Sequence, residues 1–288
     1  MAVITPAISR AFVTSAKLAA APRRTRTLAD TPPVELKATE AQSLVVGSGL
    51  IVAAENVPVQ TREDLINCTL FAQLSASGTV PDPTQVSKWY AAYFKTLTAL
   101  GWAQSDSHFE EYSFSSQNAE AHKAMMKVLT VLLGPQAAVL AVVQTALDAL
   151  QSMNENSPWI TLFDSQSKTG KSAHFQVATA QIDPGGLLQT ALVAFDLKAT
   201  SSLTQVLFFR FASGSTSLKF ASGKATIYEA ALQGQRVAIA ARLAAYREAY
   251  IGQVVFPPPP GPRGTISRAR RPRARSIRPK NMSRLLLA

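Results

Sequence analysis

The sequence has few of the residues from which metal and redox sites are built. It contains one cysteine, Cys68, and three histidines, His108, His122 and His174, that lie far apart. A single cysteine excludes an intramolecular disulfide, a cysteine-based zinc site and a CxxC redox motif. The histidines form no HxH or HxxxH pair of the kind that metal sites use. We therefore predict that the chain binds no metal and no cofactor.

Catalytic motifs are also missing. Residues 167–172 read SKTGKS and resemble the end of a phosphate-binding loop, but that loop needs a glycine where Ser165 stands and a helix afterwards. A strand pattern follows instead, which predicts a hairpin turn. No GxSxG elbow supplies a nucleophile. His174 and Asp196 lie on separate predicted strands and could meet, but we do not expect them to. We predict no catalytic residues and favour a non-enzymatic protein, with an enzyme of unrecognised site as an alternative.

Charge is scarce and unevenly placed. Only 16% of the residues are charged, although the net charge is +11. Residues 1–29 hold five basic residues and residues 257–288 hold nine, and neither segment contains an acid. Residues 30–256 therefore carry a net charge of −3. A high pI usually suggests a basic nucleic-acid-binding domain, but here the positive charge belongs to the two ends of the chain.

The composition predicts three segments. Residues 1–54 are interpreted as a disordered basic extension and linker, with a short strand as an option in its apolar end, and 55–256 as a single folded domain. The first 29 residues have the composition of an organelle transit peptide, which is one option. They lack the apolar run of a secretory signal, so the other option is a cytoplasmic or non-classically secreted protein. Residues 257–288 begin with four prolines and form a basic tail that is expected to bind anionic lipid or another anionic polymer, such as nucleic acid. Its candidate anion-binding residues are Arg268, Arg270, Arg271, Arg273, Arg275 and Arg278.

The period of the apolar residues changes along the domain. Helical spacing marks 61–75, 82–102, 118–133, 135–153 and 227–251, and Thr61 with Asp64 is close to a capping box. Alternation marks strands, with a weak one at 107–116 and five at 159–164, 173–182, 188–198, 203–212 and 216–225. Short connections between the five favour antiparallel pairing. We predict an α+β fold with helices (about 61–153 and 227–251) packed on an antiparallel sheet of about five strands (159–225).

One long segment has no charge at all. Residues 128–147 read VLTVLLGPQAAVLAVVQTAL, between Lys127 and Asp148. A run of this length suggests a membrane span, but Gly134 and Pro135 divide it into halves too short to cross. We predict a helical hairpin, either buried in the soluble core or sheltered there and able to enter a bilayer. Its candidate membrane-facing residues are Val128, Leu132, Leu133, Val139, Leu140 and Val143.

Four segments carry a resemblance to a known type of protein. They are TREDLINCTLFAQL (61–74), KWYAAYFKTLTALGW (88–102), DSQSKTGKSAHFQV (164–177) and LVAFDL (192–197). Together they resemble soluble bacterial and fungal proteins of the Erwinia virulence-factor (Evf) type. The resemblance implies a fold of helices and strands, no enzymatic activity and one acylated cysteine, for which Cys68 is the candidate. From its place on an apolar helix face, Cys68 is otherwise expected to be buried.

These observations favour a non-enzymatic protein of virulence-factor or toxin character. We expect it to interact with a lipid membrane or a host surface, with the hairpin in 128–147 as the membrane element. The alternative is an interaction module whose basic tail docks on anionic lipid or nucleic acid.

Overall fold

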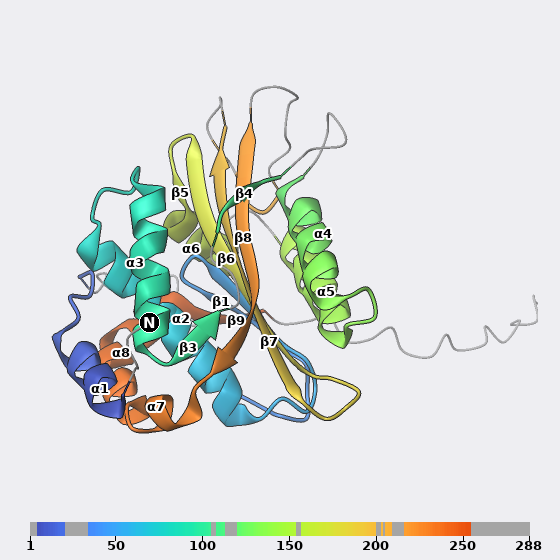
Figure 1. The fold of residues 1–288 in the computed structure, drawn as a ribbon. Helices are drawn as coiled ribbons and strands as arrows, with labels where there is room; N and C mark the ends of the chain where they lie inside the picture. The colour runs from blue at the N-terminus through green and yellow to red at the C-terminus, as the bar shows by residue number, and fades with distance from the viewer. Residues whose placement is uncertain are drawn as a thin grey trace, which may run out of the picture. The chain divides into compact units, whose positions relative to one another are not determined.

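The computed structural model describes residues 5–20, 34–104, 108–112, 120–153, 157–199, 203, 205–208 and 216–254. These residues form helices packed on both faces of one mixed sheet, which confirms the α+β class (Figure 1). The order of the strands along the main path of the sheet is β3-β8-β7-β6-β2-β1-β9, with β4 beside β8 and β5 beside β6. The strands are β1 (Gln42–Val46), β2 (Gly49–Ala53), β3 (Trp102–Gln104), β4 (Glu110–Glu111), β5 (Lys168–Thr169), β6 (Ser172–Ile182), β7 (Leu188–Lys198), β8 (Ser217–Ile227) and β9 (Ile251–Val254).

The long strands β6, β7 and β8 form the predicted antiparallel meander. Val177 lies opposite Val193, and Val193 lies opposite Ser222 on the next strand. The SKTGKS segment contains β5, the turn and the first residue of β6. Gly170 in the turn has a positive φ of 60°, so the predicted hairpin turn is confirmed. A positive φ suits glycine because it has no Cβ to clash with the backbone.

The sheet is larger and less regular than the five antiparallel strands predicted. β1 and β2 form a hairpin, and β2 pairs with β6 in parallel, so the sheet is mixed. The segment 159–164 is not a strand but part of helix α6 (Pro158–Ser167), which Pro158 begins at its first position. The segment 203–212 gives no strand in its described residues, 203 and 205–208, and its other residues lie outside the described part of the chain. Of the weak strand predicted at 107–116, the described residues 108–112 contain the two residues of β4, and the others lie outside the described part of the chain.

Helices cover the two faces of the sheet unequally. One face carries α1 (Pro6–Ser15), α2 (Val59–Thr79), α3 (Val86–Ala99), α7 (Glu229–Gln233) and α8 (Arg236–Tyr250), and the other carries α4 (Ala121–Leu133) and α5 (Ala138–Ser152) (Figure 1). Helix α6 belongs to the same apolar cluster as α4 and α5. We call the first set the α2 layer and the second, with α6, the hairpin layer. Neighbouring strand residues face opposite layers: Val46 and Ile51 pack under the α2 layer, while Val45 packs under the hairpin layer. A strand buried on both faces reads as a continuous apolar run rather than an alternating one.

The composition predicted that residues 1–54 form a disordered extension and linker. The described part of this segment instead contains α1, β1 and β2. Helix α1 packs in the α2 layer, and β1 and β2 occupy the interior of the sheet. The chain after α1 lies against α2, where the backbone amide of Ala19 donates to the carbonyl of Leu74 at 2.9 Å. Gly78 permits this approach, because a Cβ there would overlap the carbonyl oxygen of Lys17. The composition of a segment does not reveal such tertiary partners.

Helix α2 begins before the predicted capping box. Its first residue is Val59, so Thr61 and Asp64 lie inside the helix and do not cap it. Asp64 is buried and its carboxylate accepts hydrogen bonds from the Arg236 guanidinium, at 2.9 Å from Nε and 2.6 Å from Nη2. The residue therefore ties α2 to α8 rather than closing the end of α2.

Candidate functional site

The charge-free segment forms the helical hairpin that the sequence predicted. Helix α4 ends at Leu133 and is followed by Gly134, whose φ is +87°. Helix α5 begins at Ala138, although the sequence had suggested a start at Pro135, three residues earlier. The two helices are 13 and 15 residues long, or about 20 Å each at 1.5 Å per residue. Within the described residues, no helix is long and apolar enough to span a bilayer.

The hairpin contacts the sheet through aliphatic side chains. Four of the six candidate residues, Val128, Val139, Leu140 and Val143, are buried in one apolar cluster with residues of β1, β2, β6, β7 and β8. The other two, Leu132 and Leu133, are half-buried near the turn of the hairpin. Val131, which the sequence analysis did not single out, is 81% exposed. The hairpin thus buries an apolar stripe and leaves the outer side of its turn uncovered.

Hydrogen bonds anchor the hairpin at the start of each helix. The backbone amide of His122 donates to the carbonyl of Leu207 at 2.9 Å, and the amide of Val139 donates to Oε1 of Gln181 at 3.1 Å. His122 is buried, and its Nε2 lies 3.4 Å from Oε2 of Glu120. Burial lowers the pKa of His122 because the charged imidazolium loses its hydration, while Glu120 acts in the opposite sense. Between these anchors the attachment is apolar.

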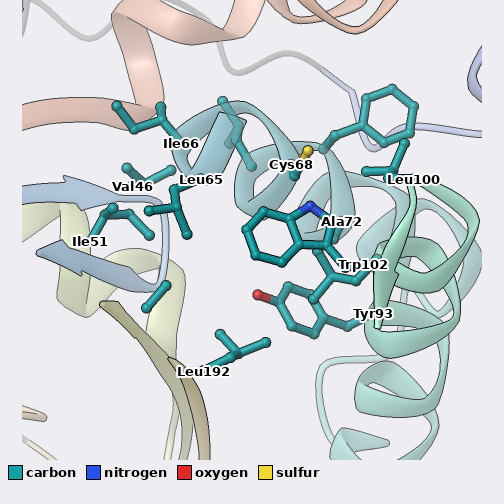
Figure 2. Close-up of a cluster of buried hydrophobic side chains, with 14 of the residues drawn as sticks. Val46, Ile51, Leu65, Ile66, Cys68, Ala72, Tyr93, Leu100, Trp102 and Leu192 are labelled. Atoms are coloured by element: carbon teal, nitrogen blue, oxygen red, sulfur yellow. The ribbon is translucent and has the colours of Figure 1, made fainter. Parts of the chain in front are cut away.

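Cys68 lies in the core of the α2 layer, which confirms the expected burial. Figure 2 shows its sulfur among Ala72, Leu100 and the indole of Trp102, and the residue is 1% exposed. Burial raises the pKa of the thiol to about 12, so the nucleophilic thiolate is suppressed near neutral pH. An acyl chain would reach this sulfur only after α2 opens locally. Acylation of Cys68 stays a prediction.

The structure places His174 opposite Asp196, which corrects the expectation that the two residues do not meet. They are directly opposite each other on β6 and β7, with Lys219 of β8 opposite Asp196. The His174 ring packs on Trp89, with centroids 4.4 Å apart, and burial lowers its pKa to about 4. Burial raises the pKa of Asp196. Sequence alone could not pair them, because the signal is the register of two strands.

An open pocket of about 390 Å³ lies beside this pair. It is formed by the N-terminal end of α3 and by Asp196 and Lys198 of β7, and its remaining lining is Thr84, Gln85, Val86, Ser87 and Lys88. Its ionisable groups are one carboxyl, Asp196, and two ammonium groups, Lys88 and Lys198, so the lining holds no pair of carboxyls of the kind that acid–base catalysis uses. Among the described residues no three histidine, cysteine or acidic side chains come together at a metal-binding distance. The arginines of the predicted anion-binding tail lie outside the described residues.

Comparison with known proteins places structures of toxins and a virulence factor beside this fold. No protein-family model matches the chain, and no curated protein matches it. A solved delta-endotoxin structure is 14% identical, with 72% of this chain and 90% of that chain covered and a TM-score of 0.40. Activated Cyt2Ba from Bacillus thuringiensis subsp. israelensis is 11% identical over 47% of this chain and 78% of that one, with a TM-score of 0.29. The Evf virulence factor is 8% identical over 70% of this chain and 84% of that one, with a TM-score of 0.34.

Proposed function

We propose that the protein is a non-enzymatic membrane- or host-surface-interacting protein of toxin character, whose α4–α5 hairpin leaves the sheet and enters a lipid bilayer. The observation that carries the proposal is the uncharged segment 128–147 of the hairpin layer, which is attached to the sheet by aliphatic contacts. Lipid tails can replace such contacts, because hydrophobic and dispersion interactions have no directional requirement. A buried charge in the same segment would oppose the transfer.

The solvent side of the hairpin fits the same function. Its exposed residues within 128–147 include Ala141, Gln144 and Thr145, which are small or uncharged. The exposed charges of the two helices, Lys123, Lys127 and Asp148, lie outside that segment. Each helix is too short to cross alone, so the inserted hairpin would lie in the outer part of the bilayer or assemble with other copies. Its release exposes the apolar face of β6 and β7, which then also contacts lipid.

The test places charges on the hairpin without disturbing the folded state. The full chain with Ala141→Glu and Thr145→Glu, two exposed positions one turn apart on α5, is compared with the wild type for dye release from phospholipid vesicles. The matched control is Ala241→Glu with Ala245→Glu, two exposed positions with the same spacing on α8. Wild type and control are expected to release dye, and the hairpin variant to lose at least about tenfold in rate because each buried charge opposes insertion.

Two results would contradict the proposal. One is the absence of any binding or release by the wild type across lipid charge and pH. The other is equal release by the hairpin variant and the wild type, with both variants shown by circular dichroism to be folded.

The basic tail supports a second candidate function. Residues 257–288 carry nine basic residues without an acid, so they would be attracted to anionic lipid or another anionic polymer. Deletion of 257–288 is then expected to remove binding to anionic vesicles at low salt. Retained binding after the deletion would reject the tail as the docking element.

A further inference from the structure

The open pocket at the start of α3 combines charges of both signs in one lining. Residues 84–88 form one wall, and Asp196 and Lys198 of β7 form the other. Phe195 and Leu197 pack under the hairpin layer, so strand alternation turns Asp196 and Lys198 toward the α2 layer. Figure 1 shows α3 on that side of the sheet, opposite α4 and α5. We call this cavity the α3 pocket, and it is separate from the hairpin.

Most of the lining suits an anion. Lys88 and Lys198 bring two ammonium groups to the pocket, and both residues are exposed. The first turn of α3 contains no acidic residue, and no side-chain hydrogen bond caps its N-terminus. The first amides of a helix have no partner within the helix, so those of Val86, Ser87 and Lys88 are available to an anion.

The carboxylate that precedes this turn is occupied by its own loop. Oδ1 of Asp82 accepts from the amide of Thr84 at 2.9 Å and from its hydroxyl at 2.7 Å. Oδ2 of Asp82 accepts from Nε2 of Gln85 at 2.9 Å. Asp82 is not part of the pocket lining, and its hydrogen bonds leave the first amides of α3 uncapped.

Asp196 gives the pocket a place for a cation. Its Oδ1 is buried and has no hydrogen-bond partner among the described residues. His174 lies opposite Asp196 on one side, and its pKa of about 4 keeps the imidazole neutral at pH 7. Lys219 lies opposite on the other side, where it is also opposite Glu111 of β4. A buried carboxylate without a donor is costly, so a ligand that brings a donor to Asp196 is favoured.

We propose that the α3 pocket binds a small aminophosphate, with its phosphate on Lys88, Lys198 and the α3 amides and its primary ammonium on Asp196. A ligand with both charges matches the lining better than phosphate alone, because Asp196 repels an anion. A primary ammonium donates charge-assisted hydrogen bonds to a carboxylate. A quaternary ammonium has no N–H and is bound by aromatic faces, and none of the described lining residues is aromatic.

This proposal goes beyond the proposed function, because the site does not require the hairpin to move. The same aminophosphate chemistry occurs in free phosphoethanolamine and in the headgroup of phosphatidylethanolamine. The pocket volume of about 390 Å³ leaves room for such a group. The experiment therefore measures binding of the soluble compound first and then distinguishes the two sources.

Isothermal titration calorimetry of the full chain at pH 7 with O-phosphoethanolamine tests the site. We expect one molecule to bind per chain. Lys88→Gln with Lys198→Gln should weaken binding at least about tenfold, through the loss of two charged donors. The matched control is Lys95→Gln with Lys224→Gln, which changes the charge equally at two exposed lysines outside the lining. The control should bind like the wild type, since the basic tail is the same in all three proteins.

The part of Asp196 is tested with Asp196→Asn and with three further compounds. The variant should bind phosphoethanolamine at least about tenfold more weakly and inorganic phosphate no more weakly than the wild type. The wild type should bind phosphocholine, which has no N–H, more weakly than phosphoethanolamine. Ethanolamine alone should also bind more weakly, because it lacks the phosphate. Circular dichroism checks that each variant is folded.

Three results would overturn the proposal. The first is the absence of phosphoethanolamine binding by the wild type. The second is equal binding by the wild type and the Lys88/Lys198 variant, or an equal loss in the control. The third is equal binding of phosphoethanolamine and phosphocholine, or an Asp196→Asn variant that binds phosphoethanolamine normally, because either would remove the ammonium from Asp196.

Flotation with vesicles then identifies the source of the aminophosphate. The vesicles are phosphatidylcholine with and without phosphatidylethanolamine, which carry no net charge and so do not attract the basic tail. Stronger binding with phosphatidylethanolamine, lost in the Lys88/Lys198 variant, supports the site as a headgroup site. Equal binding to both vesicles, together with calorimetric binding, supports a site for the free compound. A wild type that binds phosphoethanolamine but no vesicle overturns the proposed function and leaves the α3 pocket standing.

Discussion

The two helical layers of this protein attach to the same sheet by different means. The α2 layer is tied to it by buried polar groups: Gln73 donates to Oε1 of Gln176 at 3.0 Å, and Tyr90 donates to the carbonyl of Phe195 at 2.8 Å. Within the hairpin layer, α4 and α5 present valine, leucine and methionine to the same strands, with no charge in 128–147, while α6 carries the buried Asp164, which accepts from the amide of Val206 at 3.0 Å. Polar attachments are directional and costly to break without a partner, whereas aliphatic ones can be exchanged for lipid.

The difference explains why one layer is the candidate for movement. Arg62 in the α2 layer is 1% exposed and donates to four acceptors, the carbonyls of Val57, Ala38 and Ala54 and the side chain of Gln42. Removing α2 from the sheet would break this set and leave a guanidinium and several carbonyls without partners. Releasing the hairpin breaks the anchors at His122 and Val139 and exposes apolar surface.

The largest effect is expected from Arg62→Met. It leaves buried carbonyls without donors, and each such group costs about 1–3 kcal/mol, so we expect the free energy of unfolding to fall by about 4 kcal/mol. Urea denaturation followed by circular dichroism measures it. A loss below about 1 kcal/mol would show that the polar attachment of the α2 layer is weaker than its geometry indicates.

Leu147→Ala tests the hairpin layer in the same way. Leu147 is 1% exposed in the apolar core beneath α5. The cavity should cost about 3 kcal/mol, as for other buried leucines. Hydrogen exchange should quicken in α4 and α5 more than in α2, since these helices are held by apolar contacts. Uniform quickening in both layers would contradict their independence.

His174→Phe tests the α2 layer at acid pH. The pKa of His174 is about 4 in the folded chain and about 6.5 in the unfolded chain, so the unfolded state binds the proton first. The folded state therefore keeps its full stability above about pH 6.5 and loses up to about 3 kcal/mol as the pH falls to 4. Asp196, whose pKa is raised, acts in the opposite sense.

The measured quantity is the difference between variant and wild type in unfolding free energy as a function of pH. It should favour the variant progressively between pH 6.5 and pH 4, because phenylalanine takes up no proton. A difference that does not change with pH would mean that His174 is not buried in its neutral form.

Gly78→Ala gives the smallest expected effect and tests the N-terminal part of the α2 layer. Alanine normally stabilises a helix relative to glycine, but here its Cβ would overlap the backbone of Lys17. We expect a net loss of about 2 kcal/mol, in the range of overpacked cores, and faster proteolysis of residues 5–20. A stabilised variant would show that this segment does not rest on α2.

The sequence predicted what depends on local patterns. Apolar spacing located α3, α4 and α5 and the three long strands, and Gly134 marked the end of the first hairpin helix. Alternation failed at 159–164, where Pro158 starts a helix, and at β1, where burial on both faces removes the alternation. The candidate residues of the hairpin were found because an uncharged run is visible without a structure.

By itself, the sequence determined the distribution of charge, the uncharged hairpin and the helical and strand periods, because each is a property of neighbouring residues. Only the tertiary structure decided that residues 42–53 lie inside the sheet, through the parallel pairing of β2 with β6, and that Asp64 meets Arg236 across 172 positions. Contacts between distant segments depend on which faces are buried together, and many distant pairings satisfy the same local pattern. The contrast between an α2 layer held by polar groups and an α4–α5 hairpin held mainly by aliphatic ones therefore emerges only when the chain is folded.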